Sequence, residues 1–575
     1  MKRLFFVAIA TLIIGFNSIA GSDESLLKDK VSEIFNGKVE IYLSFDNKYL
    51  DETLWHALSI DYVNGDLVYT YANKSSFEIL LQNNIPYSIL RSPGEVDFDL
   101  NMKTWEDLLD KQTRNSWDYY PTYGAYVSMM NQFETDFPNL CKIHNIGSSV
   151  SGRDLLFAKI SSDVNENNAK HQFMYTSTMH GDETTGFVLM LRLIDYLLTN
   201  YGVKDDITEL LDNVEIWICP NENPDGTYTN DNSTVNGATR SNANGYDLNR
   251  NYPNPVNSPS NQQAETIAMM NFVEDKYFTM SANMHGGIEL VNFPFDSWTS
   301  SVRMHADHNW WVKVSREYAD SAQYYSPSGY MTAFGGITHG GDWYVVYGSR
   351  QDYMNWYKNT RELTLELSNT KLLSPSSLPA HWNYNYRSFL NYIKQSTYGI
   401  HGVVTDKDTG DPLQAMVTIM GHDKFNSEVY SSHIHGYFAR PILAGTYNVR
   451  FSKYGYDNVV FENVNVSNYQ TVMLDVEMTA WPSSINDEFK LPEVTIAPNP
   501  VNQGSRISIT GAEGMRLNIN IYNTLGVLID ELHNGTISSD KADFSLDNLL
   551  LHKPGVYFVK VSGEGVNKVL KILIL

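Results

Sequence analysis

The central part of the chain alternates short apolar runs with longer amphipathic stretches. Runs that predict strands are "LLFAKIS", "QFMYTST", "VEIWICP", "TMSANMH" and "ELTLELS". Stretches between them, such as "FVLMLRLIDYLL", place apolar residues at helical spacing. This alternation predicts an α/β domain with a mixed central sheet between about residues 116 and 396. Chemistry in such sheets gathers at the carboxyl ends of the strands.

Residues 21–115 predict a separate, small α+β unit. "KVEIYLSF" and "GDLVYTYA" alternate like strands, and "IPYSIL" returns as a strand. Between them, "SSFEILLQNN" has helical spacing behind a serine N-cap. A unit of this size between a leader and a larger domain is typical of a pro-segment, so we expect a zymogen. An unrelated N-terminal binding domain is the alternative.

The first residues predict a signal peptide over 1–20. Lys2 and Arg3 precede an apolar stretch that ends at Phe16, and Ser18-Ile19-Ala20 fits a cleavage site. The apolar stretch is shorter than the ~20 residues that a membrane span needs. We therefore expect a secreted protein without a transmembrane segment.

Beyond residue 396 the pattern changes to short alternating strands with turns rich in Gly, Asp and Pro. Residues 397–480 predict a small β-sandwich, and residues 481–492 a linker. Residues 493–575 alternate again and predict a second β-sandwich, which holds no candidate catalytic cluster.

Composition narrows the classes of partner. With 575 residues the chain is too long for one core, and its net charge of -24 argues against binding nucleic acid or an anionic membrane. Cys141 and Cys219 lie in apolar, strand-like runs, which favours buried free thiols. A disulfide between them stays open at this point, because sequence does not give the geometry.

The candidate chemistry begins in "TMHGDETTG", where His180 and Glu183 flank a tight turn between a strand and a helix. A catalytic zinc site needs three protein ligands and an open position for water. His285, at the end of the apolar strand in "MSANMHGGIEL", is the candidate third ligand.

Further polar residues suit the same site. Glu366 stands alone among apolar residues in "LTLELS", where a carboxylate either pairs with a cation or acts as a base. In "RSNANGYDLNRNYP", Arg240 and Arg250, with Asn249 beside the latter, suit carbonyl polarisation and carboxylate binding. Asp247 is positioned to orient His180.

Taken together, the motifs resemble the zinc metallocarboxypeptidases. They occur in the family's order, as "HGDE", "PNENPDG", "GYDLNRNYP", "MHGGIELVNFPFD", "GDWYVVYGSRQDY" and "LTLELS". The similarity is greatest to the regulatory branch that includes carboxypeptidases N, E and D. It covers about half of the chain and extends into residues 397–480, which resemble that branch's transthyretin-like domain. The implied fold is a carboxypeptidase-like α/β catalytic domain, preceded by a small α+β pro-segment and followed by two β-sandwich modules.

The resemblance also implies roles. One Zn²⁺ per catalytic domain is expected on His180, Glu183 and His285. Glu366 is expected to be the general base, and Arg240 to polarise the scissile carbonyl. The free carboxylate of a peptide or protein C-terminus is expected to be held by Asn249, Arg250 and Tyr344.

Two further positions bear on specificity. In the regulatory branch, an aspartate and a glutamine at the places of Asp296 and Gln351 favour a terminal Lys or Arg. A carboxylate at a pocket base is the expected partner of a cationic side chain. The alternative is that Asp296 only caps a turn. Arg350, beside Gln351, departs from the branch and would weaken the preference if it pointed inward.

The final module resembles the C-terminal sorting domain of proteins exported by the type IX secretion system of Bacteroidetes. "APNP", "IYNTLG", "PGVYFVKV" and "KVLKILIL" carry the likeness. It implies the type IX secretion machinery as a partner and a secreted or cell-surface location. A plain accessory β-sandwich is the alternative.

The leading hypothesis is therefore a secreted zinc carboxypeptidase that prefers C-terminal Lys or Arg. A broad-specificity carboxypeptidase, or a zinc amidase or deacylase acting on small acylated or cell-wall peptides, shares the chemistry. A catalytically dead peptide-binding module is a third class, which the presence of Glu366 disfavours.

Overall fold

The computed structural model describes residues 24–166, 168–256, 258–259, 261–481, 492–523, 528–551, 554–563 and 566–574. The predicted signal peptide and most of the predicted linker lie outside the described residues. The chain divides into two compact units, 1–397 and 398–575, and each is described by itself. Within the described residues no helix combines the length and hydropathy that crossing a bilayer requires.

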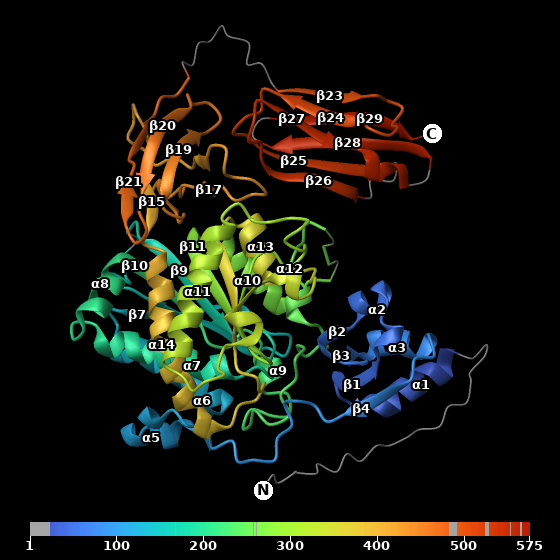
Figure 1. Cartoon of the computed structure of the whole chain (residues 1–575), viewed down its shortest axis with the longest axis vertical. Coiled ribbons are helices and arrows are strands. Elements are labelled where there is room, and N and C mark those ends of the chain that lie inside the picture. Colours follow the sequence, from blue (N-terminus) through green and yellow to red (C-terminus); the bar gives the residue numbers. More distant parts are fainter. Residues whose placement is uncertain are drawn as a thin grey trace. The chain divides into compact units, whose positions relative to one another are not determined.

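The N-terminal residues fold into the small α+β domain that the sequence predicts (Figure 1). Its sheet has the order β2-β3-β1-β4. The strands are β1 (Glu40–Asp46), β2 (Ser59–Asn64), β3 (Leu67–Asn73) and β4 (Tyr87–Leu90). The helical segments are α1 (Glu24–Phe35), η1 (Asn47–Tyr49), α2 (Glu52–Ala57) and α3 (Lys74–Gln82). The predicted serine cap of α3 is wrong, because Asn73 caps the helix and accepts a bond from the backbone N–H of Ser76.

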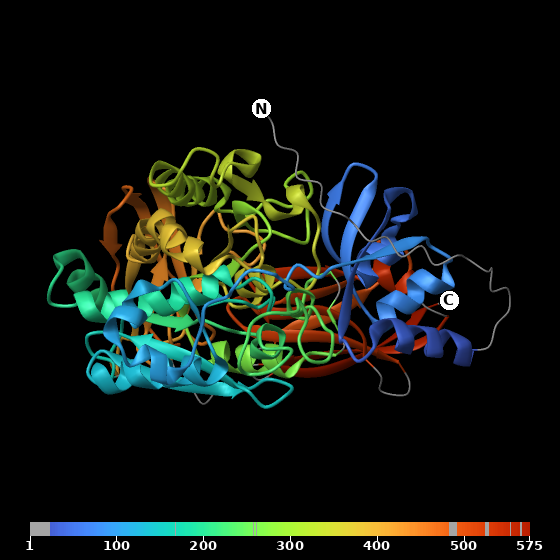
Figure 2. The ribbon, with the colours of Figure 1, turned by 90° about the horizontal axis from the view of Figure 1, so that it is seen from below.

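Alternation along β1 gives this small sheet two different faces. Ile41, Leu43 and Phe45 pack into a core with apolar residues of α1 and α3, and the helices cover that face in Figure 1 and Figure 2. Glu40 lies on the opposite face and accepts hydrogen bonds from the backbone N–H groups of Arg240 and Ser241 in the larger domain. Because the side-chain period of a strand is two, one short strand serves both contacts.

A connecting region, residues 91–122, joins the two domains of the first unit. Its elements are β5 (Met102–Lys103), α4 (Trp105–Leu108), α5 (Lys111–Ser116) and β6 (Tyr120–Pro121). β5 and β6 pair in parallel as a separate two-stranded ladder.

The larger domain of the first unit is the predicted α/β domain with a mixed sheet. In the described part of the chain its sheet has eight strands, in the order β13-β12-β14-β11-β9-β10-β8-β7. The strands are β7 (Cys141–Ser148), β8 (Asp154–Ile160), β9 (His171–Ser177), β10 (Val214–Cys219), β11 (Phe278–His285), β12 (Glu289–Phe293), β13 (Ile337–His339) and β14 (Arg361–Leu367). β10, β9, β11 and β14 run parallel to one another, which places their carboxyl ends at one edge.

Helices cover both faces of this sheet. The α-helices are α6 (Tyr123–Asp136), α7 (Thr185–Asn200), α8 (Asp205–Asn213), α9 (Pro224–Thr227), α10 (Ala264–Glu274), α11 (His308–Tyr324), α12 (Gly340–Trp343), α13 (Arg350–Tyr357) and α14 (Leu378–Gln395), and the 3-10 turns are η2 (Leu248–Arg250), η3 (Ala333–Gly336) and η4 (Pro375–Ser377). Alternation along β9 separates the layers. Tyr175 packs edge to face against Phe389 of α14, whereas Met174 packs in a cluster with Met269 of α10. The apolar runs read as strands because these central strands are buried on both sides.

The second unit holds two β modules. The first pairs β18-β15-β21 with β22 attached to β15, and β17-β16-β19-β20, around a common apolar core. Its strands are β15 (Gly399–Asp406), β16 (Met416–Ile419), β17 (Val429–Tyr430), β18 (Tyr437–Arg440), β19 (Gly445–Ser452), β20 (Val459–Val466), β21 (Thr471–Met473) and β22 (Val476–Met478). The likeness of this module to a transthyretin-like domain stays a prediction.

The last module has the sheets β23-β24-β27 and β26-β25-β28-β29 around a second core. Its elements are β23 (Glu493–Ala497), β24 (Arg506–Thr510), β25 (Arg516–Asn523), β26 (Leu528–Thr536), β27 (Lys541–Ser545), η5 (Asp547–Leu551), β28 (Gly555–Gly563) and β29 (Val566–Ile574).

Candidate metal centre and substrate cleft

The candidate metal ligands meet at the carboxyl ends of β9 and β11. β9 ends at Ser177, and His180 and Glu183 lie in the turn that leads into α7. His285 is the last residue of β11, which pairs with β9 in parallel. Two neighbouring strands that end at one edge therefore bring together residues about a hundred positions apart in the sequence.

The three ligand atoms converge on one point. Oε2 of Glu183 lies 3.0 Å from Nδ1 of His180 and 2.9 Å from Nδ1 of His285, and the two nitrogens are 3.0 Å apart. All three side chains are buried. Tetrahedral bonds of ~2.0 Å place ligand atoms ~3.3 Å apart, so this spacing fits a single zinc ion.

Both imidazoles are oriented from behind. Nε2 of His180 lies 3.0 Å from Oδ1 of Asp247, and Nε2 of His285 lies 2.8 Å from the side-chain amide of Asn283. Burial alone would raise the pKa of Asp247, but Arg240 and His180 outweigh it and hold that pKa well below its usual range. Asp247 is therefore an anion that can fix the ring of a metal-binding histidine.

Glu366 lies beside the cluster. It is the register partner of His285 in the parallel pair of β11 and β14. Among the described residues its buried Oε2 atom has no hydrogen-bond partner. Burial, and then the neighbouring Glu183, raises the pKa of Glu366 well above its usual value. A buried carboxylate oxygen without a partner is able to accept a hydrogen bond or a proton from a ligand or a water.

Arg240 joins the metal cluster to the N-terminal domain. Its NH1 donates to Oε1 of Glu183 at 3.1 Å, and its Nε donates to Oδ2 of Asp247 at 3.0 Å. The same Nε lies 2.7 Å from the hydroxyl of Ser59, which also bonds to Asp247. The guanidinium is thus buried beside the candidate metal ligand Glu183.

A cavity of about 210 Å³ lies beside Arg250, whose NH1 atom is 4.0 Å from Oδ2 of Asp247. Arg250 and Tyr344 line it, together with residues of the loop after Tyr344. Asn249, the third predicted member of the carboxylate clamp, accepts a bond from the backbone N–H of Arg350 through its side-chain oxygen at 3.0 Å. Arg250 keeps a partly exposed guanidinium, which suits an anionic ligand.

Residues of the N-terminal domain line the other side of the same cavity. Trp55, His56, Leu58 and Ile60 form the other part of its lining. The indole N–H of Trp55 donates to the carbonyl oxygen of Val345 at 3.1 Å, and its ring meets the ring of Tyr344 edge to face. The contact surface therefore covers the predicted carboxylate clamp.

The sequence reasoning missed Lys371. Its ammonium lies 2.8 Å from Oε1 of Glu183 and 2.9 Å from Asp61 of the N-terminal domain. A lysine five residues after Glu366, in the mixed stretch "SNTKLLS", carries no pattern that marks it. Tyr71, which donates to Asp182 at 2.7 Å, was missed for the same reason.

The predicted specificity residues lie together in a second buried cluster. Oδ1 of Asp296 accepts bonds from the amide groups of Gln351 at 2.9 Å and Asn292 at 3.1 Å. Among the described residues, the amide oxygens of Gln351 and Asn292 have no partner. Gly340 packs so closely here that a Cβ atom would lie 2.0 Å from Oδ1 of Asp296, which explains a glycine at that position.

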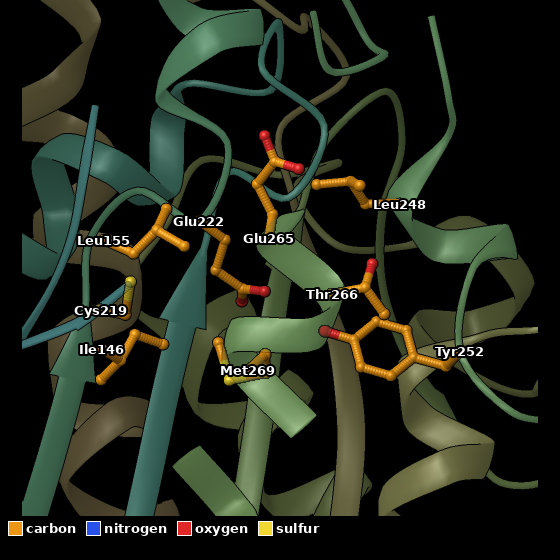
Figure 3. A pocket seen from close by; sticks show the side chains of 9 residues that line it. All are labelled: Ile146, Leu155, Cys219, Glu222, Leu248, Tyr252, Glu265, Thr266 and Met269. Carbon is orange, nitrogen blue, oxygen red and sulfur yellow. The ribbon is translucent and has the colours of Figure 1, made fainter. Parts of the chain in front are cut away.

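Arg350 points away from this cluster into the core. Its fully buried guanidinium bonds to Glu362 at 2.8 Å and 3.0 Å and to Glu222 at 2.6 Å. Glu222 also lines a cavity of about 10 Å³, room for about one water (Figure 3). Cys219 lines that cavity too, and both cysteines are free and buried, as predicted. The charge of Arg350 is thus neutralised within the core.

Comparisons with known proteins identify a family model, curated relatives and a solved structure to which the chain is similar. Residues 126–388 match the model of the zinc carboxypeptidase family. Carboxypeptidase D of Mus musculus is 31% identical over 376 residues, 63% of this chain and 27% of the relative. Carboxypeptidase M of Mus musculus is 32% identical over 338 residues, 56% of this chain and 75% of the relative. The crystal structure of carboxypeptidase A from Helicoverpa armigera has a TM-score of 0.46 at 16% identity, over 62% of this chain and 97% of that one.

The chain spans only 27% of the length of the carboxypeptidase D relative. Residues 495–575 match the model of a secretion system C-terminal sorting domain, which confirms the predicted export. Carboxypeptidase M, by contrast, is matched over 75% of its length. The region that matches the family model contains His180, Glu183, His285 and Glu366. The chain belongs to the zinc carboxypeptidase family.

Proposed function

We propose that the protein is a zinc-dependent carboxypeptidase that hydrolyses the last peptide bond of peptides or proteins, preferably before a C-terminal Lys or Arg. The observation that carries the proposal is the unpartnered oxygen of Glu366. It stands beside three converging ligand atoms and near a cavity that Arg250 lines. Arg250 is linked to this cluster through Asp247, which lies 4.0 Å from Arg250 and 3.0 Å from His180.

The residues of the site divide the chemistry between them. When bound, a zinc ion supplies a Lewis acid that lowers the pKa of a water molecule towards ~7. Glu366 would accept a proton at its unpartnered Oε2 atom and later pass it to the leaving amine. Arg240, held by Asp247 and Glu183, donates to the oxygen that becomes negative as the carbonyl is attacked.

The carboxylate clamp makes the activity an exopeptidase. Arg250 and Tyr344 line the cavity, and Asn249 lies beside Arg250 in η2. An internal peptide bond offers no carboxylate to such a clamp. A zinc amidase acting on a small acyl group has no need of it, so the clamp favours the carboxypeptidase over that alternative.

Unsatisfied acceptors support the basic preference. Asp296 supplies a buried carboxylate, and the amide oxygens of Gln351 and Asn292 beside it have no partner among the described residues. Buried acceptors left without donors cost free energy, which a multi-donor ammonium or guanidinium group would recover. A broad-specificity enzyme would more simply line this pocket with apolar side chains.

The N-terminal domain is proposed to be a pro-segment that blocks substrate entry. Ser59 engages Arg240, Asp61 engages Lys371, and Trp55 covers Tyr344. Each contact uses a group that the proposed reaction or its metal site needs. Cutting the connecting region at 91–101 and releasing the domain is expected to open the cleft.

The test uses the full chain loaded with zinc, before and after limited proteolysis of the connecting region. Hippuryl-Arg, hippuryl-Lys and hippuryl-Phe are the substrates, each with and without a chelator. We expect release of Arg and Lys to exceed that of Phe, to rise on proteolysis and to stop with chelator. An absence of chelator-sensitive release from all three would overturn the proposal.

A further inference from the structure

Asp352 is a buried carboxylate that holds the backbone beneath the specificity residue. It lies in the first turn of α13 and is fully buried. Its Oδ1 accepts the N–H of Asp296 and its Oδ2 the N–H of Ser297, both at 2.8 Å. Both oxygens of Asp352 thus accept backbone N–H groups, and these two hydrogen bonds fix the position of the Asp296 carboxylate.

Two carboxylates therefore lie in one buried cluster, with Asp352 bonded to the backbone of Asp296. The hydrogen-bond donors to the carboxylate of Asp296 are neutral: the side-chain amides of Asn292 and Gln351 and the side chain of Ser349. The charged groups that act on it from neighbouring elements are Arg250 of η2 and Glu362 of β14. Within the described residues neither Asp296 nor Asp352 lies in an ion pair, because Arg350 on the helix of Asp352 is bonded to Glu222 and Glu362.

We propose that Asp352 is a positioning residue and the second charge of the specificity pocket, so that the preference for a basic C-terminal residue rises with pH as Asp352 ionises. The inference rests on the proposed carboxypeptidase function. With both carboxylates charged, the pocket carries a doubled negative charge that only a cationic side chain neutralises. When Asp352 is protonated, one negative charge is lost. The backbone N–H of Asp296 or of Ser297 then bonds to a neutral, weaker acceptor.

Burial, and then the neighbouring Asp296, raises the pKa of Asp352 to about 7. Ionisation is therefore expected within the working range of an assay, with the charged form above about pH 7. A terminal arginine stays charged throughout, because its pKa exceeds ~12. A change of the arginine preference with pH therefore reflects ionisation of the protein and not of the substrate.

The experiment measures kcat/KM for hippuryl-Arg and hippuryl-Phe on the zinc-loaded full chain, before and after limited proteolysis, at a series of pH values on both sides of 7. Both substrates use the same metal site and the same Glu366, so the titration of these groups cancels in the ratio. We expect the ratio of Arg to Phe to rise on the order of tenfold across the series, the effect of one nearby charge at an effective dielectric constant of ~20.

Two variants sharpen the result. Asp352→Asn is expected to give a low ratio that no longer changes with pH. Asp342→Asn removes a carboxylate that is 42% exposed and is expected to keep the native profile. A flat ratio in the native chain, or an unaltered profile in Asp352→Asn, would overturn the inference. No chelator-sensitive hydrolysis of either substrate would instead overturn the proposed function, so the two failures are distinguishable.

Discussion

Glu366 and His285 are register partners on the parallel strands β14 and β11. Their side chains therefore leave the sheet at the same level and on the same edge, one as a metal ligand and the other with an unpartnered oxygen. Neighbouring positions on a ladder are fixed by backbone hydrogen bonds, so this geometry does not depend on a loop. In the proposed reaction, this arrangement would assign metal binding to His285 and proton transfer to Glu366.

Replacing Glu366 by Gln is expected to remove activity while leaving the metal in place. The substitution keeps shape and takes away the proton acceptor, so kcat should fall about 10²–10⁴-fold, the usual worth of a general base. Steady-state kinetics with hippuryl-Arg and the zinc content of the purified protein check this. Retention of kcat within a few-fold, or loss of the zinc, would contradict the assigned role.

The Asp247→Asn variant tests whether the hydrogen bond between Asp247 and His180 strengthens zinc binding. Asp247 fixes His180 from behind, and losing such a partner typically lowers metal affinity 10–100-fold. Competition between the protein and a zinc-binding dye measures the affinity. Asp342→Asn, which removes a charge far from the ligands in sequence and partly exposed, serves as the control and is expected to leave affinity unchanged. Equal affinities in both variants would show that Asp247 does not orient His180.

The docking of the N-terminal domain is expected to weaken as pH rises. Burial, and then Asp182, raises the pKa of Glu40 to about 7 in the docked state, above its value of 4.5 in water. The docked state thus binds a proton that the open state releases between these values, so docking loses stability with rising pH. We expect proteolysis of the connecting region to quicken on the order of tenfold from pH 6 to pH 8.

The Glu40→Gln variant tests whether Glu40 is the source of this pH dependence, and the Glu52→Gln variant is its control. Its neutral side chain should flatten the pH dependence of cleavage. The Glu52→Gln variant should keep it, because Glu52 has a side chain that is 93% exposed. An identical pH dependence in native protein and Glu40→Gln would rule out Glu40 as its source.

Arg350 is expected to be a structural residue. Arg350→Met leaves the buried carboxylates of Glu222 and Glu362 without their partner, which typically costs about 3–5 kcal/mol. Arg316→Met breaks a partly exposed pair with Asp320 and should cost no more than about 1 kcal/mol. Guanidinium denaturation of the two variants gives both values. A stability loss in Arg350→Met as small as that in Arg316→Met would contradict the buried network.

The sequence could predict the parts of the site that follow from strand ends. Apolar runs locate the strands, and polar residues at their termini, such as His285 and Glu366, then fall at one edge of a parallel sheet. The direction of Arg350 could not be predicted, since adjacent residues on a helix face different sides. Ser59 and Lys371 also escaped, because their partners lie in another domain or another loop and no periodicity links them.

The central claim is that a zinc-dependent site removes single residues from free C-termini. Mass spectrometry of a peptide ending in Arg, beside its C-terminally amidated twin, tests it most directly after proteolysis of the connecting region. The account predicts that the free peptide loses only its last residue, that the amidated twin stays intact, and that a chelator stops the reaction until zinc is restored. Cleavage of the amidated twin, cleavage at an internal bond, or an unchanged free peptide would contradict it.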